Sequence, residues 1–442
     1  MDANRFFTHS LRDPRVTRIL AAVLDAVEPG KLVRDYLLNN PLPKHKRIYL
    51  FGIGKASEAM TFAAAETLTH FTDAFAITKL ALSTVEGHGS GRTFERIAVI
   101  EGGHPIPDER SVEAGEAALE FVSKLNEDDL LICLISGGGS ALMIAPQAGI
   151  TLRDIQLLTK ELLSCGASID EINLLRSKLD RVKGGGLARA TKAKIISLIL
   201  SDVLGNPLEI IASGPTVTNS KTNSEARSIL ERYNLLEKIP IGIMNILESD
   251  SLLSALPMQE HTLMGTRALA VQNIVIGDIH TAMQAALKQA QAEGFDSEVI
   301  DSNLHGEAKE IGLQFGEKLK EERGRKQHPF CIIAGGETTV TLHGNGKGGR
   351  NQELALAAVN VLDGVQDILL ISIATDGDDG PTDAAGAVVN GETRQRAERL
   401  GLSAADHLSR NDAYVYFHSL GDLIKPGYTG TNVNDILFLF GF

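Results

Sequence analysis

The sequence lacks the features that mark membrane, secreted and disulfide-stabilised proteins. No apolar run is long enough to span a membrane; the longest, such as ILLISIA at 368–374, suit buried strands. Residues 1–15 lack the apolar core of a signal peptide. The chain has only three cysteines, without disulfide or zinc spacing, and two of them, Cys133 and Cys331, lie in strand-like runs. These absences predict reduced thiols, no membrane partner and a cytoplasmic location.

Other absences exclude whole classes of function. No G-x-x-x-x-G-K-[ST] sequence occurs, so a P-loop ATPase is excluded. The nucleophile elbow G-x-S-x-G is not satisfied around Ser140, because Leu142 stands where its second glycine belongs. Basic residues are in the minority, and the net charge of −13 argues against nucleic-acid binding. An anionic substrate would therefore need a locally positive pocket.

The first half of the chain alternates strands and helices. Strands are predicted at 47–52, 96–102, 129–136 and 194–201, separated by helices at 54–68, 108–122, 151–164 and 168–181. The run DLLICLIS at 129–136 is continuously apolar, as in strands that are buried on both faces. This order predicts an α/β fold with a doubly wound, Rossmann-like parallel sheet.

The second half predicts a smaller α/β domain. Strands are expected at 273–277, 296–302, 330–336, 338–344, 367–377 and 435–440. The strand at 338–344 follows its predecessor too closely for a crossover helix, so this second sheet should be mixed. At 442 residues the chain is too long for one ordinary core, and the mostly helical stretch 219–267 is the expected boundary. We predict domains at 1–245 and 246–442.

The loop SGGGSA at 136–141 is the clearest candidate for phosphate binding. It follows the buried strand 129–136, at the edge of a parallel sheet where ligands bind. Successive glycines let the backbone approach a ligand, so that N–H groups and serine hydroxyls can surround phosphate oxygens. The alternative is a tight turn without a ligand. We expect cofactor contacts from Ser136, Gly137, Gly138, Gly139 and Ser140.

Cations lie in or just before two further glycine-containing segments of the first domain. Lys55 in FGIGKASE begins a helix at the ligand edge, where a cation and helix N–H groups can meet an anion. Its G-x-G is weak evidence for a dinucleotide site, because Ser57 replaces the third glycine. Arg176 and Lys183 precede the glycines that begin at Gly184. Each of these cations has an alternative reading as a solvated surface charge.

The segment SDVLGNP at 201–207 and three loops of the second domain supply the remaining candidates. Asp202 ends a strand and suits a metal or hydroxyl contact, while Asn206 suits either a turn or a cofactor contact. Glu337 lies between two strands in GGET, and Arg350 ends the glycine-rich loop HGNGKGGR. The loop ATDGDDGPTDAAGA holds four aspartates, of which Asp376 and Asp379 are the metal candidates. The histidines, His104 and His343 among them, show no zinc spacing, and a structural role is expected for each.

Ten segments taken together resemble the glycerate 2-kinases, which have a Rossmann-like N-terminal domain and a C-terminal MOFRL domain. They are GIGKA, GGHPIPD, SGGGSA, NLLRSKLDRVKGGGLA, SDVLGNP, SGPT, GGET, GKGGRNQE, ATDGDDGPTDAAGA and TGTNVND. They run from residue 52 to 435 in the family's order. In one departure, Asp180 stands where the family often has a small hydroxyl residue, and we assign this position no role.

The resemblance implies transfer of the ATP γ-phosphoryl group to the 2-hydroxyl of D-glycerate, with Mg²⁺, in a cleft between two domains. Lys55, Arg176 and Asp202 would be catalytic, and the nucleotide would contact SGGGS, Lys183, Gly184 and Asn206. Glycerate would contact Lys55, Arg176, Glu337, Arg350 and Asp376, and the metal would be held by Asp202, Asp376 and Asp379. A homodimer is possible. The alternatives are an NAD(P)H-dependent hydroxypyruvate reductase, a non-catalytic nucleotide or sugar-acid binding protein, and a kinase acting on the 3-hydroxyl or on another sugar acid.

Overall fold

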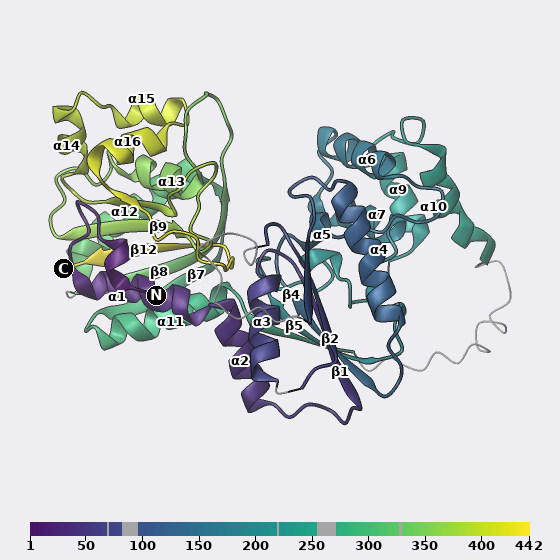
Figure 1. The fold of residues 1–442 in the computed structure, drawn as a ribbon. Helices are drawn as coiled ribbons and strands as arrows, with labels where there is room; N and C mark the ends of the chain where they lie inside the picture. Colours follow the sequence, from purple (N-terminus) through teal and green to yellow (C-terminus); the bar gives the residue numbers. More distant parts are fainter. Residues whose placement is uncertain (69, 82–95, 219–220, 254–270, 327–328) are drawn as a thin grey trace. The chain divides into compact units, whose positions relative to one another are not determined.

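The computed structural model describes residues 1–442 except 69, 82–95, 219–220, 254–270 and 327–328 (Figure 1). The chain forms two compact units. The N-terminal unit comprises Val33–Leu200 and Asn206–Ile276, and the C-terminal unit comprises Met1–Leu32, Ser201–Gly205 and Gly277–Phe442. The division of the sequence at residues 245 and 246 stays a prediction.

A six-stranded sheet forms the centre of the N-terminal unit. Its strands are β1 (Arg47–Ile53), β2 (Asp73–Thr78), β3 (Ile97–Glu101), β4 (Asp129–Ile135), β5 (Lys194–Leu200) and β6 (Val271–Gly277). The order is β3-β2-β1-β4-β5-β6, and the pairs from β3 to β5 are parallel. This is the order of a doubly wound Rossmann-like sheet, so the predicted fold class is confirmed.

Two strand assignments differ from the sequence-based expectation. The strand predicted at 273–277 belongs to this sheet as β6 and does not open the second one. Strand β2 was not predicted, although its residues Ala74–Thr78 are all buried. Both errors concern pairing between distant parts of the chain, which a local apolar pattern does not encode.

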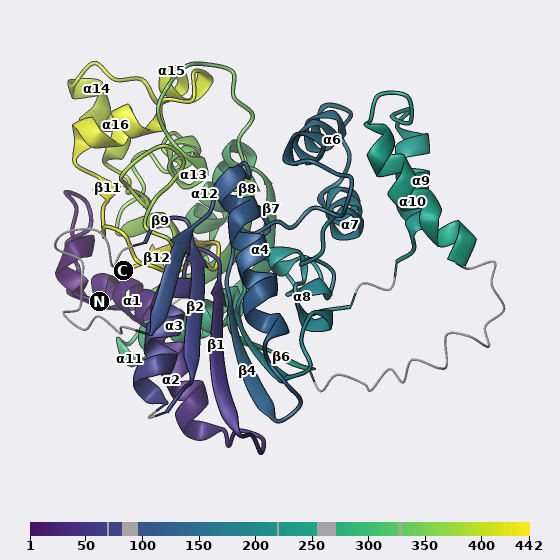
Figure 2. The ribbon, with the colours of Figure 1, turned by 45° about the vertical axis from the view of Figure 1, so that its right-hand side comes forward.

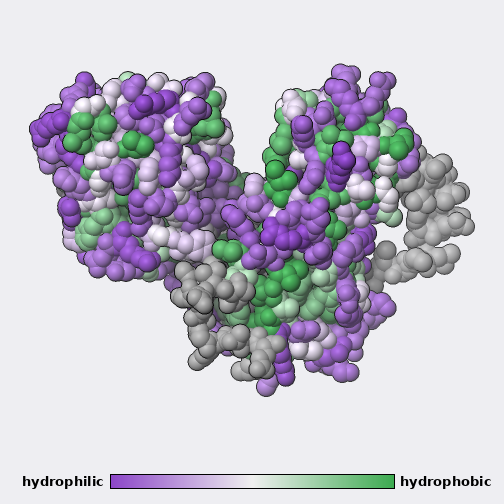
Figure 3. All heavy atoms as spheres, turned by 45° about the horizontal axis from the view of Figure 1, so that its top comes forward, coloured by the Kyte–Doolittle hydropathy of each residue, from purple (hydrophilic) through white to green (hydrophobic). Residues whose placement is uncertain are grey.

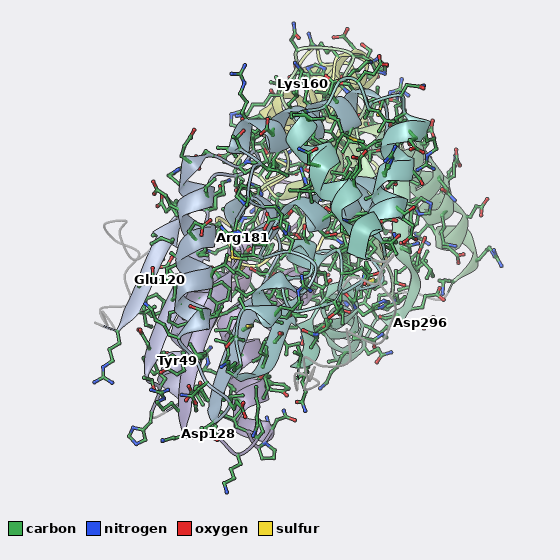
Figure 4. All side chains as sticks on the ribbon, turned by 90° about the vertical axis from the view of Figure 1, so that its right-hand side faces the viewer. Tyr49, Glu120, Asp128, Lys160, Arg181 and Asp296 are labelled. Carbon is green, nitrogen blue, oxygen red and sulfur yellow. The ribbon has the colours of Figure 1, made fainter. Side chains whose placement is uncertain are left out.

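Two helices lie next to this sheet, and one of them begins at a capping box. Helix α3 (Ser57–Thr67) follows β1 directly, and α4 (Glu109–Ser123) begins at Asp108, which forms a capping box with Ser111. Phe121 of α4 packs against the rings of Tyr49, Phe51 and Phe75 on β1 and β2. Figure 4 labels Glu120 on this helix and Tyr49 on the neighbouring strand. The contacts hold α4 against one face of the sheet.

A group of helices with its own core completes the N-terminal unit (Figure 2). It consists of α6 (Leu152–Ser164), α7 (Ile169–Leu179), α9 (Asn223–Arg232) and α10 (Ile241–Leu253). Thr151, Ser168 and Thr222 cap the first three through capping boxes. Their inward leucines and isoleucines form one buried cluster. The shorter helices α5 (Gly139–Leu142) and α8 (Gly186–Arg189) follow glycine-rich loops, and α2 (Pro29–Asn39) precedes β1.

The C-terminal unit is built on a mixed sheet, as predicted. Its strands are β7 (Asp296–Glu307), β8 (Phe330–Thr339), β9 (Ile368–Ala374), β10 (Gly386–Val389), β11 (Leu423–Ile424) and β12 (Asp435–Gly441), in the order β11-β10-β9-β12-β8-β7. Strand β7 is parallel to β8, whereas β12 is antiparallel to both β8 and β9. The separate strand predicted at 338–344 is wrong, because Thr338 and Thr339 continue β8 beside β7.

Helices cover both faces of this sheet (Figure 1). They are α1 (Pro14–Ala26), α11 (Ile279–Ala292), α12 (Ala308–Arg325), α13 (Arg350–Ala358), α14 (Thr393–Arg399), α15 (Ala404–Ser409) and α16 (Ala413–Leu420). On β12, Leu437 and Leu439 join the core formed with α12, α13 and α16. Phe440 contacts Phe295, which follows α11. The side-chain alternation of a strand thus places adjacent residues in two cores.

Residues 1–32 belong to the C-terminal unit although they are the first in the sequence. Helix α1 buries Val16, Ile19 and Val23 and packs on α11. Ahead of it, the buried Asp422 accepts hydrogen bonds from the Ser10 N–H (2.7 Å) and the Thr8 hydroxyl (3.2 Å). Asp422 also pairs with Arg396 at 2.8 Å. The buried Asp422 carboxylate therefore links Thr8 and Ser10, near the N-terminus, to the C-terminal part of the chain.

We expect Asp422→Ala to destabilise the protein by about 3 kcal/mol, because it removes one partner of a buried ion pair and leaves Arg396 without its countercharge. Denaturant unfolding measures the change. Glu120→Ala is the control, since its pair with Lys124 is exposed and contributes little. Equal stability of the two variants would contradict this linking role.

Among the described residues, no helix is long and apolar enough to cross a membrane. Hydrophilic side chains cover much of the face drawn in Figure 3, where smaller groups of hydrophobic residues lie between them. This distribution agrees with the ordinary share of charged residues in the sequence, 22%.

Candidate active site

Two loops meet where the strand order of the N-terminal sheet reverses, between β1 and β4. Lys55 follows β1, and the loop of Ser136 to Ser140 follows β4. The Lys55 N–H donates to the Gly137 carbonyl (2.9 Å), and the Ala56 N–H donates to the Ser136 hydroxyl (3.0 Å). Open α/β sheets bind ligands at this reversal, outside the carboxyl ends of their strands. The structure therefore brings the predicted lysine and the predicted glycine loop together.

Two glycines allow this close approach. Gly54 has φ +120°, and a Cβ there would lie 2.3 Å from the Ser136 carbonyl oxygen. Gly138 has φ +84°, and a Cβ there would lie within 3.3 Å of Lys55 and His104 side-chain atoms. Any other residue at these positions would separate the loops or collide with the side chains beside them. The missing side chain of Gly138 thus allows Lys55 and His104 to lie against the loop.

A strained turn connects this loop to a second glycine loop. Ala212, Ser213 and Gly214 have consecutive φ values of +51°, +60° and +57°. Left-handed conformation costs about 1–2 kcal/mol for a residue other than glycine, and such strain gathers at functional sites. The Ser213 hydroxyl lies 2.7 Å from the Ser140 hydroxyl, and its carbonyl accepts from the Gly184 N–H (3.0 Å). Ser213 therefore fixes the SGGGS loop relative to the KGGG loop at 183–186.

Cations outnumber carboxylates around these loops. Lys183 is buried and lies 3.4 Å from Asp180, while Arg189 donates to the Gly184 carbonyl at 2.9 Å. Burial lowers the pKa of Lys183, partly opposed by Asp180 and assisted by Arg176. Burial also lowers the pKa of Arg176 and of Arg189. Positive groups removed from water without matching carboxylates are stabilised by a bound anion.

His104 adds an uncharged group beside Lys55 and Gly138. Its ring carbon Cδ2 and nitrogen Nε2 lie 3.3 Å from the position of a Cβ on Gly138, and its Nδ1 is buried without a hydrogen-bond partner in the structure. Burial, with the charges of Lys55 and Lys79, lowers the pKa of His104 to about 4. The imidazole is therefore neutral at pH 7 and adds no charge to the site.

We expect the stability of the protein relative to a His104→Gln variant to fall as the pH is lowered from 6.5 to 4. The unfolded chain takes up this proton near pH 6.5, whereas the folded chain does so only near pH 4, so acid favours unfolding. The melting-temperature difference between the two proteins should change by at least about 2 °C over this range. A constant difference would contradict the lowered pKa.

In the C-terminal unit, the half-buried Arg350 joins two carboxylates. Arg350 donates to Asp435 through Nε at 2.5 Å and to Glu337 through Nη1 at 2.8 Å. Burial opposes the charge of Arg350, but Asp435 and Glu337 raise its pKa. Burial raises the pKa of Asp435 to about 6, opposed by Arg350. Arg350 thus already has carboxylate partners, and a contact with a substrate anion stays a prediction.

The two metal candidates of the loop after β9 have different surroundings. Asp379 is buried and caps α13, where it accepts from the N–H groups of Asn351 (3.1 Å) and Gln352 (2.8 Å). Burial, with the nearby Asp435, raises the pKa of Asp379 to about 7. Asp376 accepts from the Asp378 N–H at 3.2 Å. The sequence suggested a metal role because carboxylates at helix caps and in metal sites look alike.

A metal-ligand cluster does not form from side chains alone. In the described part of the chain, no group of three or more His, Cys, Asp or Glu residues could hold a metal ion. Mg²⁺, however, is commonly bound by one or two carboxylates together with substrate phosphates. The metal ligands Asp202, Asp376 and Asp379 stay a prediction.

The glycine-rich loop at 343–349 has a structural explanation. The Gly346 N–H donates to the Arg410 carbonyl (3.0 Å), and a Cβ on Gly344 would lie 2.4 Å from the same oxygen. Lys347 places its Nζ 4.2 Å from the centre of the Tyr414 ring. This loop packs against the segment before α16. Gly344 and Gly346 are required there, because a Cβ on either would collide with the Arg410 carbonyl oxygen.

The predicted site residues fall into two sets, one in each unit. The N-terminal unit contains Lys55, Ser136, Gly137, Gly138, Gly139, Ser140, Arg176, Lys183, Gly184 and Asn206, and the C-terminal unit contains Asp202, Glu337, Arg350, Asp376 and Asp379. Within the first set, contacts link the two glycine loops through Ser213.

Ser213 and Arg189 were not predicted to act, and the segment SGPT at 213–216 was the available signal. His104 had been expected to be purely structural.

These units correspond to known families. Residues 15–248 match a domain of unknown function, DUF4147, and residues 330–435 match the MOFRL family. The D-glycerate 2-kinase of Thermotoga maritima is 38% identical over 95% of this chain and 96% of its own length. The glycerate 2-kinase of Pyrococcus horikoshii is 40% identical over 88% of this chain and 86% of its own. The crystal structure of a Thermotoga maritima glycerate kinase covers 97% of this chain and 99% of that one, with a TM-score of 0.85 and 37% identity.

The fold and the two family matches define an α/β protein with a Rossmann-like sheet and a MOFRL domain. The chain belongs to the glycerate 2-kinase family.

Proposed function

We propose that the protein transfers the γ-phosphoryl group of ATP to the 2-hydroxyl of D-glycerate, giving 2-phosphoglycerate and ADP. The observation that carries this proposal is the buried Lys183 and the half-buried Arg176 beside two linked glycine loops at the reversal of the N-terminal sheet. Phosphoryl transfer depends mainly on positioning and on neutralising charge, and such a site supplies both. Membership of the glycerate 2-kinase family supports the same reaction.

The proposed roles follow from the chemistry of the step. The glycerate hydroxyl oxygen forms a bond to the γ-phosphorus, the bond from the γ-phosphorus to the bridging oxygen breaks so that ADP leaves with that oxygen, and the hydroxyl proton passes to solvent. Lys55 and Arg176 bind the glycerate carboxylate or the transferring phosphoryl group, where negative charge gathers. The SGGGS loop and the loop with Lys183 and Gly184 hold the nucleotide phosphates through N–H groups.

Several finer contacts are part of the proposal. Asn206 contacts the nucleotide, and Glu337, Arg350 and Asp376 contact glycerate. Asp202 orients the glycerate hydroxyl or holds Mg²⁺ together with Asp376. The metal supplies positive charge to the nucleotide phosphates when it is bound. A cytoplasmic location and a homodimer are likewise proposed.

The test is incubation of the purified protein with ATP, Mg²⁺ and D-glycerate, and identification of the product by phosphorus NMR. A 2-phosphoglycerate signal is expected. A 3-phosphoglycerate signal would keep the kinase and reject the regiochemistry. We expect no oxidation of NADH with hydroxypyruvate, and NADH oxidation without a phosphorylated product would favour the reductase alternative instead.

A further inference from the structure

A cavity of about 510 Å³ opens in the N-terminal unit outside the residues assigned to phosphate or glycerate. Its lining comes from helix α7 and from the two segments around the strained turn: Asp170, Asn173, Leu174, Pro207, Glu209, Ile210, Val217, Thr218 and Lys221. Cavities of about 300–1,000 Å³ typically hold molecules of drug size, and glycerate is much smaller. The cavity is therefore large enough for a bigger ligand group than glycerate.

The cavity is next to the KGGG loop. A Cβ on Gly185 would lie 3.1 Å from the Cα of Thr218, which lines the cavity. The Gly185 N–H donates to the Gly214 carbonyl at 2.7 Å, and the Val217 N–H donates to the same residue's carbonyl at 3.2 Å. A molecule whose phosphates contact the glycine loop can therefore extend into the cavity without a long spacer.

The lining suits a nucleoside and not a further phosphate. Leu174, Pro207, Ile210 and Val217 offer apolar surface to a flat ring, and the Asn173 amide can both donate and accept hydrogen bonds. Asp170 and Glu209 would repel phosphate, but carboxylates are the groups that bind ribose hydroxyls in related α/β folds. Lys221 is the one cation of the lining.

We propose that this cavity binds the base and ribose of the nucleotide, with the base against Leu174, Ile210 and Val217 and the ribose hydroxyls near Asp170 or Glu209. This inference rests on the proposed function, because it assumes that the nucleotide phosphates occupy the two glycine loops. It divides the nucleotide into a nucleoside held by the cavity and phosphates held by N–H groups and cations.

The test compares ADP with inorganic pyrophosphate, which lacks the base and ribose, by isothermal titration calorimetry. Val217→Trp fills the cavity, so it should weaken ADP binding about ten-fold or more and change pyrophosphate binding by less than about two-fold. Ile241→Trp, on the exposed side of α10, is the matched control and should alter neither affinity.

A second variant keeps the test independent of whether Val217→Trp folds. The double variant D170N/E209Q changes two exposed side chains and should reduce the preference for ADP over 2′,3′-dideoxy-ADP several-fold. Unchanged ADP affinity in Val217→Trp, equal weakening of ADP and pyrophosphate, or an unchanged preference in the double variant would overturn the inference. The kinase assay is separate: ADP binding that responds as expected, without any phosphorylation of glycerate, would reject the proposed function alone.

Discussion

Replacing Lys55 by alanine is expected to lower kcat/KM for the phosphorylation of glycerate by about 10²- to 10³-fold, the range for loss of one group that stabilises transition-state charge. Lys55 lies at the reversal of the sheet, and its backbone is fixed to the SGGGS loop by the hydrogen bond to Gly137. The alanine variant keeps that backbone bond, so the fold should be retained. Steady-state kinetics with both substrates, together with a melting curve, measure the two effects.

Lys194→Ala is the matched control for Lys55→Ala. Lys194 begins β5, at the amino-terminal edge of the same sheet, where its Nζ donates to the Lys44 carbonyl at 2.9 Å. Its loss removes the same charge from the protein without touching the carboxyl ends of the strands. Near-normal turnover in Lys55→Ala, or an equal loss in both variants, would reject the assigned role of Lys55.

Replacing Arg176 by alanine should lower kcat/KM by about 10²-fold and leave the melting temperature unchanged or higher. No described residue forms an ion pair with Arg176, and burial lowers its pKa, so its charge is unfavourable in the free protein. A bound anion would make the positive charge of Arg176 favourable. Removal of the guanidinium should therefore separate activity from stability, which kinetics and thermal unfolding report independently.

Arg153→Ala serves as the control for Arg176→Ala, because Arg153 lies exposed on the neighbouring helix α6. We expect this control to alter neither activity nor stability. A large fall in the melting temperature of Arg176→Ala would indicate that the arginine holds the fold together. Unaltered kinetics would remove it from the proposed anion site.

The N-terminal sheet could be predicted well because its strands carry a strong local signal. Strands β1, β4 and β5 are apolar runs that end in glycine or polar loops, and burial on both faces makes such runs continuous. The strands β2 and β6 show the limit of this reasoning. Their place depends on which neighbour they pair with, and pairing is a property of the folded chain.

The candidate site was predictable to the extent that residues with suitable chemistry follow strands of one parallel sheet. Lys55 and the SGGGS loop follow β1 and β4, so their proximity came directly from the sheet order. Ser213 was not predictable as a link, because its left-handed conformation and its contacts with Ser140 and Gly184 arise between distant segments. Asp379 lies in a loop whose carboxylates suggest a metal site in the sequence. In the structure it accepts hydrogen bonds from N–H groups at the start of α13, a role that the sequence does not indicate.

By itself, the sequence determined the α/β class, most elements of the first sheet, the glycine loops and the glycerate 2-kinase resemblance, because each depends on local patterns or on the order of short motifs. Only the tertiary structure decided that residues 1–32 complete the C-terminal unit, that β6 closes the first sheet, and that Ser213 joins two loops. These outcomes depend on burial and hydrogen bonds between residues far apart in the chain, and such contacts have no local signature.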